Sequence, residues 1–227
     1  MKIEQKLIVL FLMTCNFIYS QDTSIEHLND LAVNFTKKLS EQKIDTICVY
    51  EEYSTGLPPQ VSSSEDIDVQ NVNCDSKGTY IPTYILWKQL GKTYITKMDN
   101  CFDFSTEIID GKELWDVILK NKSILEKEKV KSFEYWSEEN GKKVKYTKAM
   151  IHSHFQNFKL IVGKGITEQN FNSYILQEKD DEYASEINEN INYKYNNSLK
   201  GKYLIDLLHK IVFKVESERK LKRVMRK

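Results

Sequence analysis

Tight turns between strand-forming segments restrict the folds that this chain can adopt more than any other feature of its sequence. Asn140-Gly141 is the preferred residue pair for a two-residue type I′ turn, and runs rich in aromatic and β-branched residues lie on both sides of it. Counting outward from this turn places Tyr135 opposite Tyr146. The pattern predicts a β-hairpin, and therefore antiparallel pairing of segments that are neighbours in sequence.

A second hairpin is expected within residues 79–100. Its turn is centred on Leu90-Gly91, which places Trp87 opposite Tyr94. Apolar residues then lie on both faces of the hairpin. This arrangement is typical of a sheet that is covered on both sides.

The remaining elements are predicted from hydrophobic periodicity. Apolar residues spaced three and four apart predict helices at both ends of the mature chain. Strands are expected at 44–53, 101–109 and 158–162, and helices at 24–42, 112–121 and 198–227. The helix at 112–121 is expected to turn four residues inward, namely Leu114, Trp115, Ile118 and Leu119. We expect an α+β fold: an antiparallel sheet built from hairpins, packed with an N-terminal and a long C-terminal helix.

The first 20 residues have the three-part pattern of a secretory signal peptide. Lys2 and Lys6 precede an apolar run over residues 7–13, and the small residue Ser20 precedes a polar stretch. A buried N-terminal helix, an uncleaved anchor and a lipid attachment at Cys15 are the alternatives. Cleavage would leave residues 21–227 as a single domain, since no linker divides them. We expect an exported protein that is periplasmic, envelope-associated or secreted, without a transmembrane segment in the mature chain.

The charge balance bears on the class of partner. The chain has 33 Lys and Arg residues and 33 Asp and Glu residues. A general nucleic-acid binder needs a basic excess to displace counterions, so no nucleic-acid partner is expected. The 41% hydrophobic content argues against a disordered chain.

The mature chain would contain three cysteines. In an oxidising compartment two of them are expected to pair, and any of the three pairings is possible. Cys74 and Cys101 flank the hairpin of residues 79–100, so we favour a disulfide between them. Cys48 lies in an apolar strand-like run and is interpreted as a buried thiol.

Known catalytic and cofactor motifs are absent from the sequence. It contains no complete phosphate-binding loop, nucleophile elbow, zinc-protease helix or calcium-binding loop. No cofactor is therefore predicted. His152 and His154 remain as a candidate metal pair, because residues i and i+2 of a strand point to the same face. The simpler interpretation is a solvated strand end.

The C-terminus is strongly basic. Its candidate docking residues are Arg219, Lys220, Lys222, Arg223, Arg226 and Lys227. They either complement the dipole of the helix end or dock on an anionic surface. An acidic run at 178–189 offers a third possibility, since it could hold the tail within the molecule.

Taken together, these features favour a non-catalytic binding or structural domain at the cell envelope. Its partner is expected to be an envelope protein or an anionic surface. The first alternative is a metal-binding protein or metal-dependent hydrolase that uses His152 and His154. The second is docking on anionic surfaces through the basic C-terminus.

Overall fold

The computed structural model describes most of the chain. The described residues are 23–55, 81–99, 102–149, 153–180 and 187–224. The predicted signal peptide, the favoured Cys74–Cys101 disulfide, His152 and the last two basic residues of the tail, Arg226 and Lys227, lie outside these ranges.

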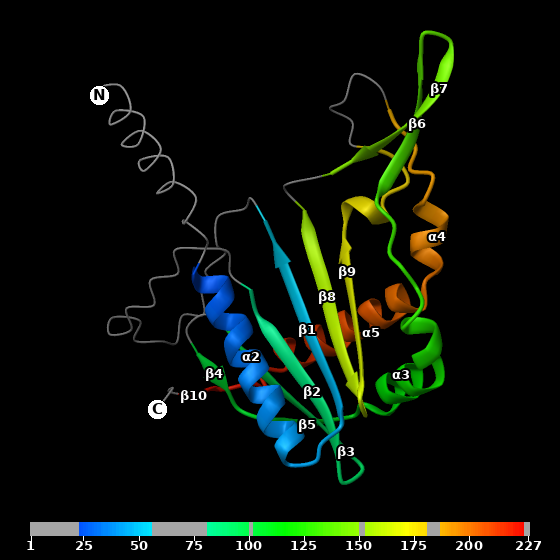
Figure 1. Cartoon of the computed structure of the whole chain (residues 1–227). Helices are drawn as coiled ribbons and strands as arrows, with labels where there is room; N and C mark the ends of the chain where they lie inside the picture. The colour runs from blue at the N-terminus through cyan, green and yellow to red at the C-terminus, as the bar shows by residue number, and fades with distance from the viewer. Residues whose placement is uncertain (1–22, 56–80, 100–101, 150–152, 181–186, 225–227) are drawn as a thin grey trace, which may run out of the picture.

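An antiparallel sheet forms the centre of the fold (Figure 1). Among the described residues it has eight strands, in the order β10-β4-β3-β2-β1-β8-β9, with β5 also paired to β3. Its strands are β1 (Thr46–Ser54), β2 (Thr83–Gln89), β3 (Lys92–Met98), β4 (Asp103–Phe104), β5 (Glu107–Ile109), β8 (His154–Val162), β9 (Gly165–Asn172) and β10 (Arg223–Val224). The α+β fold expected from the sequence is confirmed.

Both predicted hairpins are present in the predicted register. Trp87 pairs with Tyr94 across β2 and β3, and the two rings stack at 5.4 Å. In the second hairpin, β6 (Phe133–Glu139) and β7 (Lys142–Lys148), Tyr135 pairs with Tyr146. Asn140 and Gly141 have positive φ angles, as a type I′ turn requires. This hairpin forms a separate two-stranded sheet that projects from the body (Figure 1).

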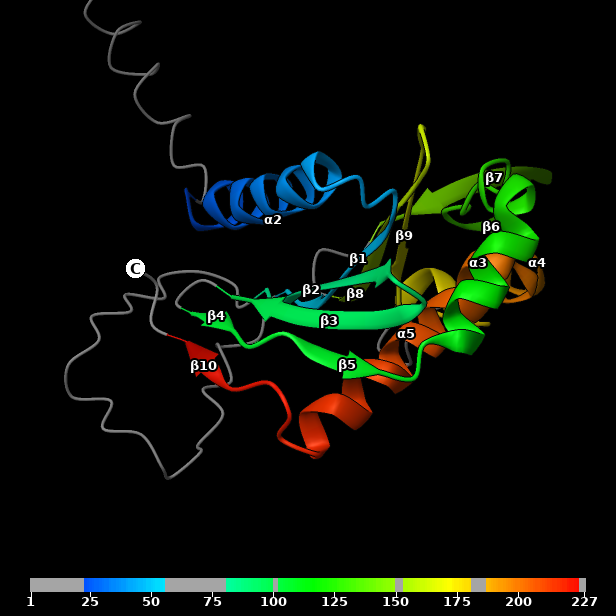
Figure 2. The ribbon, with the colours of Figure 1, turned by 90° about the horizontal axis from the view of Figure 1, so that it is seen from below.

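Helices cover the two faces of the main sheet unequally (Figure 2). Helix α2 (Thr23–Glu41) lies over β1–β3 on one face, where residues such as Ile47, Val49 and Trp87 form one core cluster. Helices α3 (Lys112–Leu125) and α5 (Lys200–Ser217) pack on the other face, around a larger cluster. The 3₁₀ helix η3 (Tyr174–Leu176) and the short α4 (Tyr193–Ser198) connect β9 to α5.

None of the described helices has the length and apolar character needed to cross a bilayer.

The C-terminal helix is shorter than expected. Instead of running to residue 227, α5 ends at Ser217, and Arg219 adopts a positive φ of 49°. The chain then buries Leu221 and pairs β10 with β4. Burial of one leucine and a strand pairing at the sheet edge therefore take the place of further helix.

Two other expectations need correction. Leu119 is 46% exposed, because α3 packs through Leu114, Trp115 and Ile118 and continues to the buried Leu125. The strand expected at 101–109 is divided into β4 and β5.

Within the acidic run, Asp180 is buried. It accepts a hydrogen bond from Tyr174 and pairs with Lys148 of the projecting hairpin. Asp180 of the acidic run therefore already has a basic partner, Lys148.

Candidate functional site

Adjacent carboxylates on β1 point to opposite faces of the sheet. Side chains alternate along a strand, so Glu51 faces the α2 side and Glu52 faces the α5 side. Each carboxylate is the centre of a distinct polar site. Neither glutamate was singled out in the sequence, because an acidic pair within a strand gives no motif.

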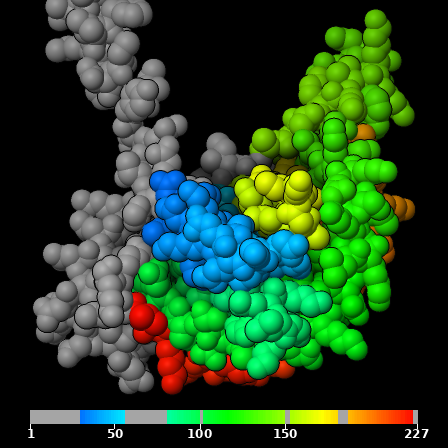
Figure 3. Space-filling model, turned by 60° about the horizontal axis from the view of Figure 1, so that its bottom comes forward, coloured from blue at the N-terminus to red at the C-terminus, as the bar shows by residue number. Residues whose placement is uncertain are grey.

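The Glu51 site is a groove beside α2. Because α2 covers β1–β3 but not the outer strands, a hollow of about 490 Å³ remains over β1, β8 and β9. Figure 3 shows this side of the molecule, with α2 in blue beside the yellow surface of β9. The groove is lined by Ala32, Val33, Thr36, Val49, Glu51, Asn157, Phe158, Lys159, Glu168, Gln169 and Asn170. Its size is within the usual range for small-molecule sites.

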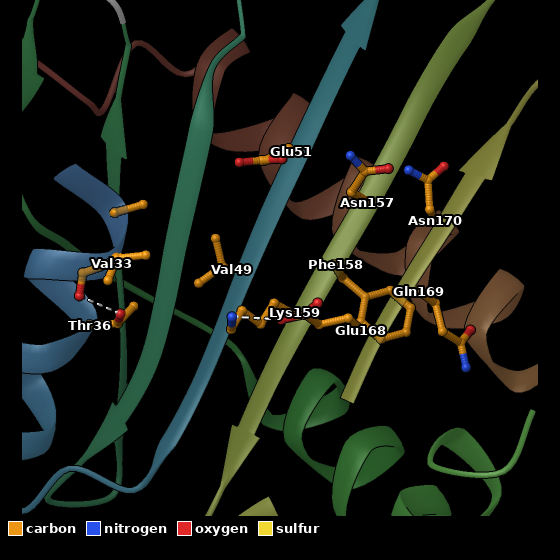
Figure 4. Close-up of a pocket in the computed structure, with 11 residues that line it drawn as sticks. Val33, Thr36, Val49, Glu51, Asn157, Phe158, Lys159, Glu168, Gln169 and Asn170 are labelled. Atoms are coloured by element: carbon orange, nitrogen blue, oxygen red, sulfur yellow. Dashed lines mark hydrogen bonds and ion pairs between the residues drawn. The ribbon is translucent and has the colours of Figure 1, made fainter. Parts of the chain in front are cut away.

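Polar groups occupy the floor of the groove (Figure 4). Glu51 pairs across the sheet with Thr83 on one side and Asn157 on the other. Thr83 Oγ1 donates to Glu51 Oε1 at 3.3 Å. Burial raises the pKa of the Glu51 carboxyl, and hydrogen bonds from Asn157 and Thr83 offset part of that rise.

Among the described residues that line this groove there is one lysine, Lys159, and it already forms an ion pair. Lys159 Nζ is 2.6 Å from Glu168 Oε1 on the neighbouring strand (Figure 4). Within the described residues no lysine, arginine or histidine forms an ion pair with Glu51. Asn157 Oδ1 is buried and has no hydrogen-bond partner in the same part of the chain. The groove therefore presents the Glu51 carboxylate without a cation among the described residues.

The Glu52 site joins β1, β8 and α5. His154 Nε2 lies 2.8 Å from Glu52 Oε1, and His209 Nδ1 of α5 lies 2.9 Å from Glu52 Oε2. The Tyr50 hydroxyl donates to Oε2 at 2.8 Å. Burial raises the pKa of Glu52, but the hydrogen bonds from His154, His209 and Tyr50 outweigh it and lower the pKa to about 2. Glu52 is therefore a charged carboxylate at neutral pH.

Of the predicted metal pair, His154 is described and His152 lies outside the described residues. His154 begins β8, and both nitrogens of its ring have partners, Ser54 Oγ and Glu52 Oε1. Among the residues that the structure describes, no group of three or more His, Cys, Asp or Glu side chains is placed to hold a metal ion. His209 of α5 is brought to the same carboxylate only by the fold.

The described part of the basic tail is exposed. Its four candidate residues, Arg219, Lys220, Lys222 and Arg223, follow α5 and lead into β10. Lys220 pairs with Glu218, and the Arg223 guanidinium lies over the Phe102 ring at 4.7 Å. Cys48 is fully buried, as expected, and burial raises the pKa of its thiol.

Searches against protein-family models, curated proteins and solved structures found no match to this chain.

Proposed function

We propose that this protein is exported and acts at the cell envelope as a binding domain, with its ligand in the groove between α2 and strands β1, β8 and β9. The observation that carries the proposal is the carboxylate of Glu51, half-buried in the groove without a cationic partner among the described residues. The activity is binding, with no chemical step at the groove.

The charge of the groove selects the ligand. A carboxylate taken partly out of water is stabilised by an opposite charge within hydrogen-bond distance. Lys159 does not supply that charge, because it pairs with Glu168. An ammonium or guanidinium group of the ligand would pair with the Glu51 carboxylate.

The rest of the groove suits an apolar body. Val33 is 55% exposed on α2 and faces Val49 of β1 across the hollow. Sites that combine apolar walls with a few polar groups are typical of small-molecule and peptide recognition. We therefore expect a ligand with a basic group at one end and an apolar chain behind it, such as a short amine or a basic peptide side chain.

Export is supported by the sequence pattern of residues 1–20, with basic residues before an apolar run and a small residue before the polar stretch. An envelope protein that presents a basic side chain would suit the groove. Accumulation of the processed protein outside the cytoplasm, measured by fractionation and N-terminal sequencing, tests this part. A protein that stays in the cytoplasmic fraction and still carries residues 1–20 would exclude export.

Binding is tested by NMR titration with hexylamine and hexanoate, two probes of similar size and opposite charge. We expect hexylamine to shift amide signals of α2, β1, β8 and β9, and hexanoate to leave them unchanged. Glu51→Gln should weaken hexylamine binding by about tenfold, because it removes one charge-assisted hydrogen bond.

Glu178→Gln is the matched control, since Glu178 is exposed and outside the groove. It should bind hexylamine as the wild type does. Equal binding of both probes, or equal binding by Glu51→Gln and wild type, would contradict the proposal.

The metal hypothesis has a separate test. Native mass spectrometry of the protein, purified without chelators, would show an added metal mass if His152 and His154 bind an ion. The mass excess should then disappear in a His152→Ala/His154→Ala double variant. A metal-free wild-type mass would remove this alternative.

A further inference from the structure

The opposite face of β1 carries a second arrangement, which goes beyond the proposed binding function. Ser54 and His154 are direct partners in the pairing of β1 with β8. Ser54 Oγ lies 3.0 Å from His154 Nδ1, and His154 Nε2 lies 2.8 Å from Glu52 Oε1. Glu52 is two residues before Ser54, so both side chains project from the same face of the strand. A serine, an imidazole and a carboxylate thus form a continuous chain.

The charge of Glu52 determines the tautomer of His154. The Glu52 carboxylate accepts a hydrogen bond from the Tyr50 hydroxyl and contacts a ring nitrogen of His209, and a carboxylate can only accept hydrogen bonds. His154 must therefore carry a proton on Nε2, and in the neutral imidazole the lone pair is on Nδ1. That lone pair faces Ser54 Oγ. In serine hydrolases the histidine that acts as general base faces the serine through Nε2 and the carboxylate through Nδ1. His154 has the same two partners with the two ring nitrogens exchanged.

The carboxylate that orients His154 is itself held in place. His209 and Tyr50 hold the second oxygen of Glu52, and Gln156 Nε2 lies 3.1 Å from the Tyr50 hydroxyl. These contacts come from β1, β8 and α5, so the position of Glu52 depends on the packing of the whole α5 face. Such fixed support keeps a base in a productive orientation.

The serine and its base are accessible. The His154 side chain is 41% exposed, and Ser54 is only partly buried. Beyond them, His209 stacks on Phe213, whose side chain is 67% exposed. An apolar group of a small molecule could therefore rest on the aromatic ring beside the polar cluster.

We propose that Ser54 is a nucleophile that accepts an acyl group from a carboxylic ester. Ser54 Oγ attacks the ester carbonyl while its proton moves to His154 Nδ1. The bond to the alcohol oxygen breaks, and the alcohol leaves with that proton. Water then attacks the acyl-serine, releases the carboxylic acid and restores Ser54. Ser54 and His154 are the catalytic residues, and Glu52 is a positioning residue.

The test uses p-nitrophenyl acetate and the purified protein. We expect release of p-nitrophenolate and, in peptide mapping after acid quench, an acetyl group on Ser54. Ser54→Ala should remove the acetylated peptide. His154→Gln should lower the acylation rate by about a hundredfold, in keeping with loss of a general base. Ser153→Ala is the matched control, because the Ser153 hydroxyl contacts Ser173 instead, and it should react as the wild type does.

A second measurement does not depend on turnover. Nitrogen NMR of the folded wild type should show His154 as the Nε2–H tautomer, and Glu52→Gln should shift the population toward Nδ1–H. Absence of the acetyl group from Ser54, an unchanged acylation rate in His154→Gln, or an Nδ1–H tautomer in the wild type would each overturn the proposal. Failure of this test leaves hexylamine binding in the groove unaffected, since the two sites lie on opposite faces.

Discussion

Gly111 and Thr93 lie so close together that a side chain at residue 111 has no room. A Cβ atom on Gly111 would be 2.4 Å from both Oγ1 and Cγ2 of Thr93. Thr93 Oγ1 also accepts a 2.9 Å hydrogen bond from Trp115 Nε1, which holds its rotamer. The contact fixes the start of α3 against β3.

We expect Gly111→Ala to lower the free energy of unfolding by about 1–3 kcal/mol, because Thr93 is β-branched and cannot rotate without losing the Trp115 bond. Gly165→Ala is the control, since its Cβ would meet only side-chain atoms of Glu126 and Lys122 at 3.3 Å or more. Urea unfolding compares the two variants. An equal loss in both would contradict the steric explanation.

Leu90 offers the reverse case, a site where substitution should stabilise the fold. It has a φ of 50° in the β2–β3 turn and is 92% exposed. A leucine in this left-handed region costs roughly 1 kcal/mol, whereas asparagine tolerates it better. Leu90→Asn should therefore raise the free energy of unfolding by up to about 1 kcal/mol. Leu90→Lys also removes the exposed leucine, but lysine does not tolerate a positive φ as asparagine does. In thermal denaturation it should therefore show no comparable gain in stability.

Glu52 should make stability depend on pH at the acid end. Its folded-state pKa of about 2 lies below the ordinary value of 4.5, so its contribution to stability is complete above the unfolded pKa and is lost as pH falls from there toward 2. The contribution at neutral pH is up to about 3 kcal/mol. Glu52→Gln should be less stable than wild type at pH near 7, and the difference should narrow as the pH is lowered through this window. Urea midpoints measured across the range test this, and a difference independent of pH would contradict it.

Cys48 should be chemically inert in the folded protein. It is fully buried on β1, and burial raises the pKa of its thiol, so little reactive thiolate forms. Iodoacetamide should modify it only in denaturant, as mass spectrometry of the unreduced protein would show. The same spectrum tests the favoured disulfide, because a Cys74–Cys101 pair makes the mass two hydrogens lighter and leaves one thiol to label. Three labelled thiols in denaturant would exclude the disulfide.

The basic tail should dock on anionic lipid if its charge has that role. Replacing Arg219, Lys220, Lys222 and Arg223 together by glutamine should weaken binding to phosphatidylserine vesicles by more than tenfold at low salt, given about 1 kcal/mol for each basic residue near the surface. Lys142→Gln/Lys143→Gln on the projecting hairpin is the control. Equal vesicle binding by the wild type, the tail variant and the hairpin control would contradict docking through the tail, whose charges would then serve contacts within the fold.

Local sequence patterns predicted most of the elements. Both hairpins have the predicted register, because turn chemistry and cross-strand pairing involve residues close in sequence. The N-terminal helix and β1 also lie close to their expected positions, and β8 contains the expected strand 158–162 but begins at His154. In contrast, β9 was missed, since Gly165–Asn172 is mostly polar and forms a strand through its pairing with β8.

The candidate sites were much less predictable. His154 was recognised, but its partners Ser54 and Glu52 precede it by 100 and 102 residues, and His209 reaches the same carboxylate from α5. Glu51 and Asn157 likewise meet only through the pairing of β1 with β8. No spacing rule connects such residues, because the contacts depend on which strands become neighbours.

The sequence by itself therefore determined the local elements of this protein, since alternation, helical spacing and tight turns act over a few residues. The tertiary structure decided where α5 ends, because burial of Leu221 and pairing of β10 compete with a further turn of helix. It also decided that Glu51 faces a groove and Glu52 faces two histidines. Adjacent residues of a strand point to opposite faces, and only the packing of helices on those faces gives each carboxylate its surroundings.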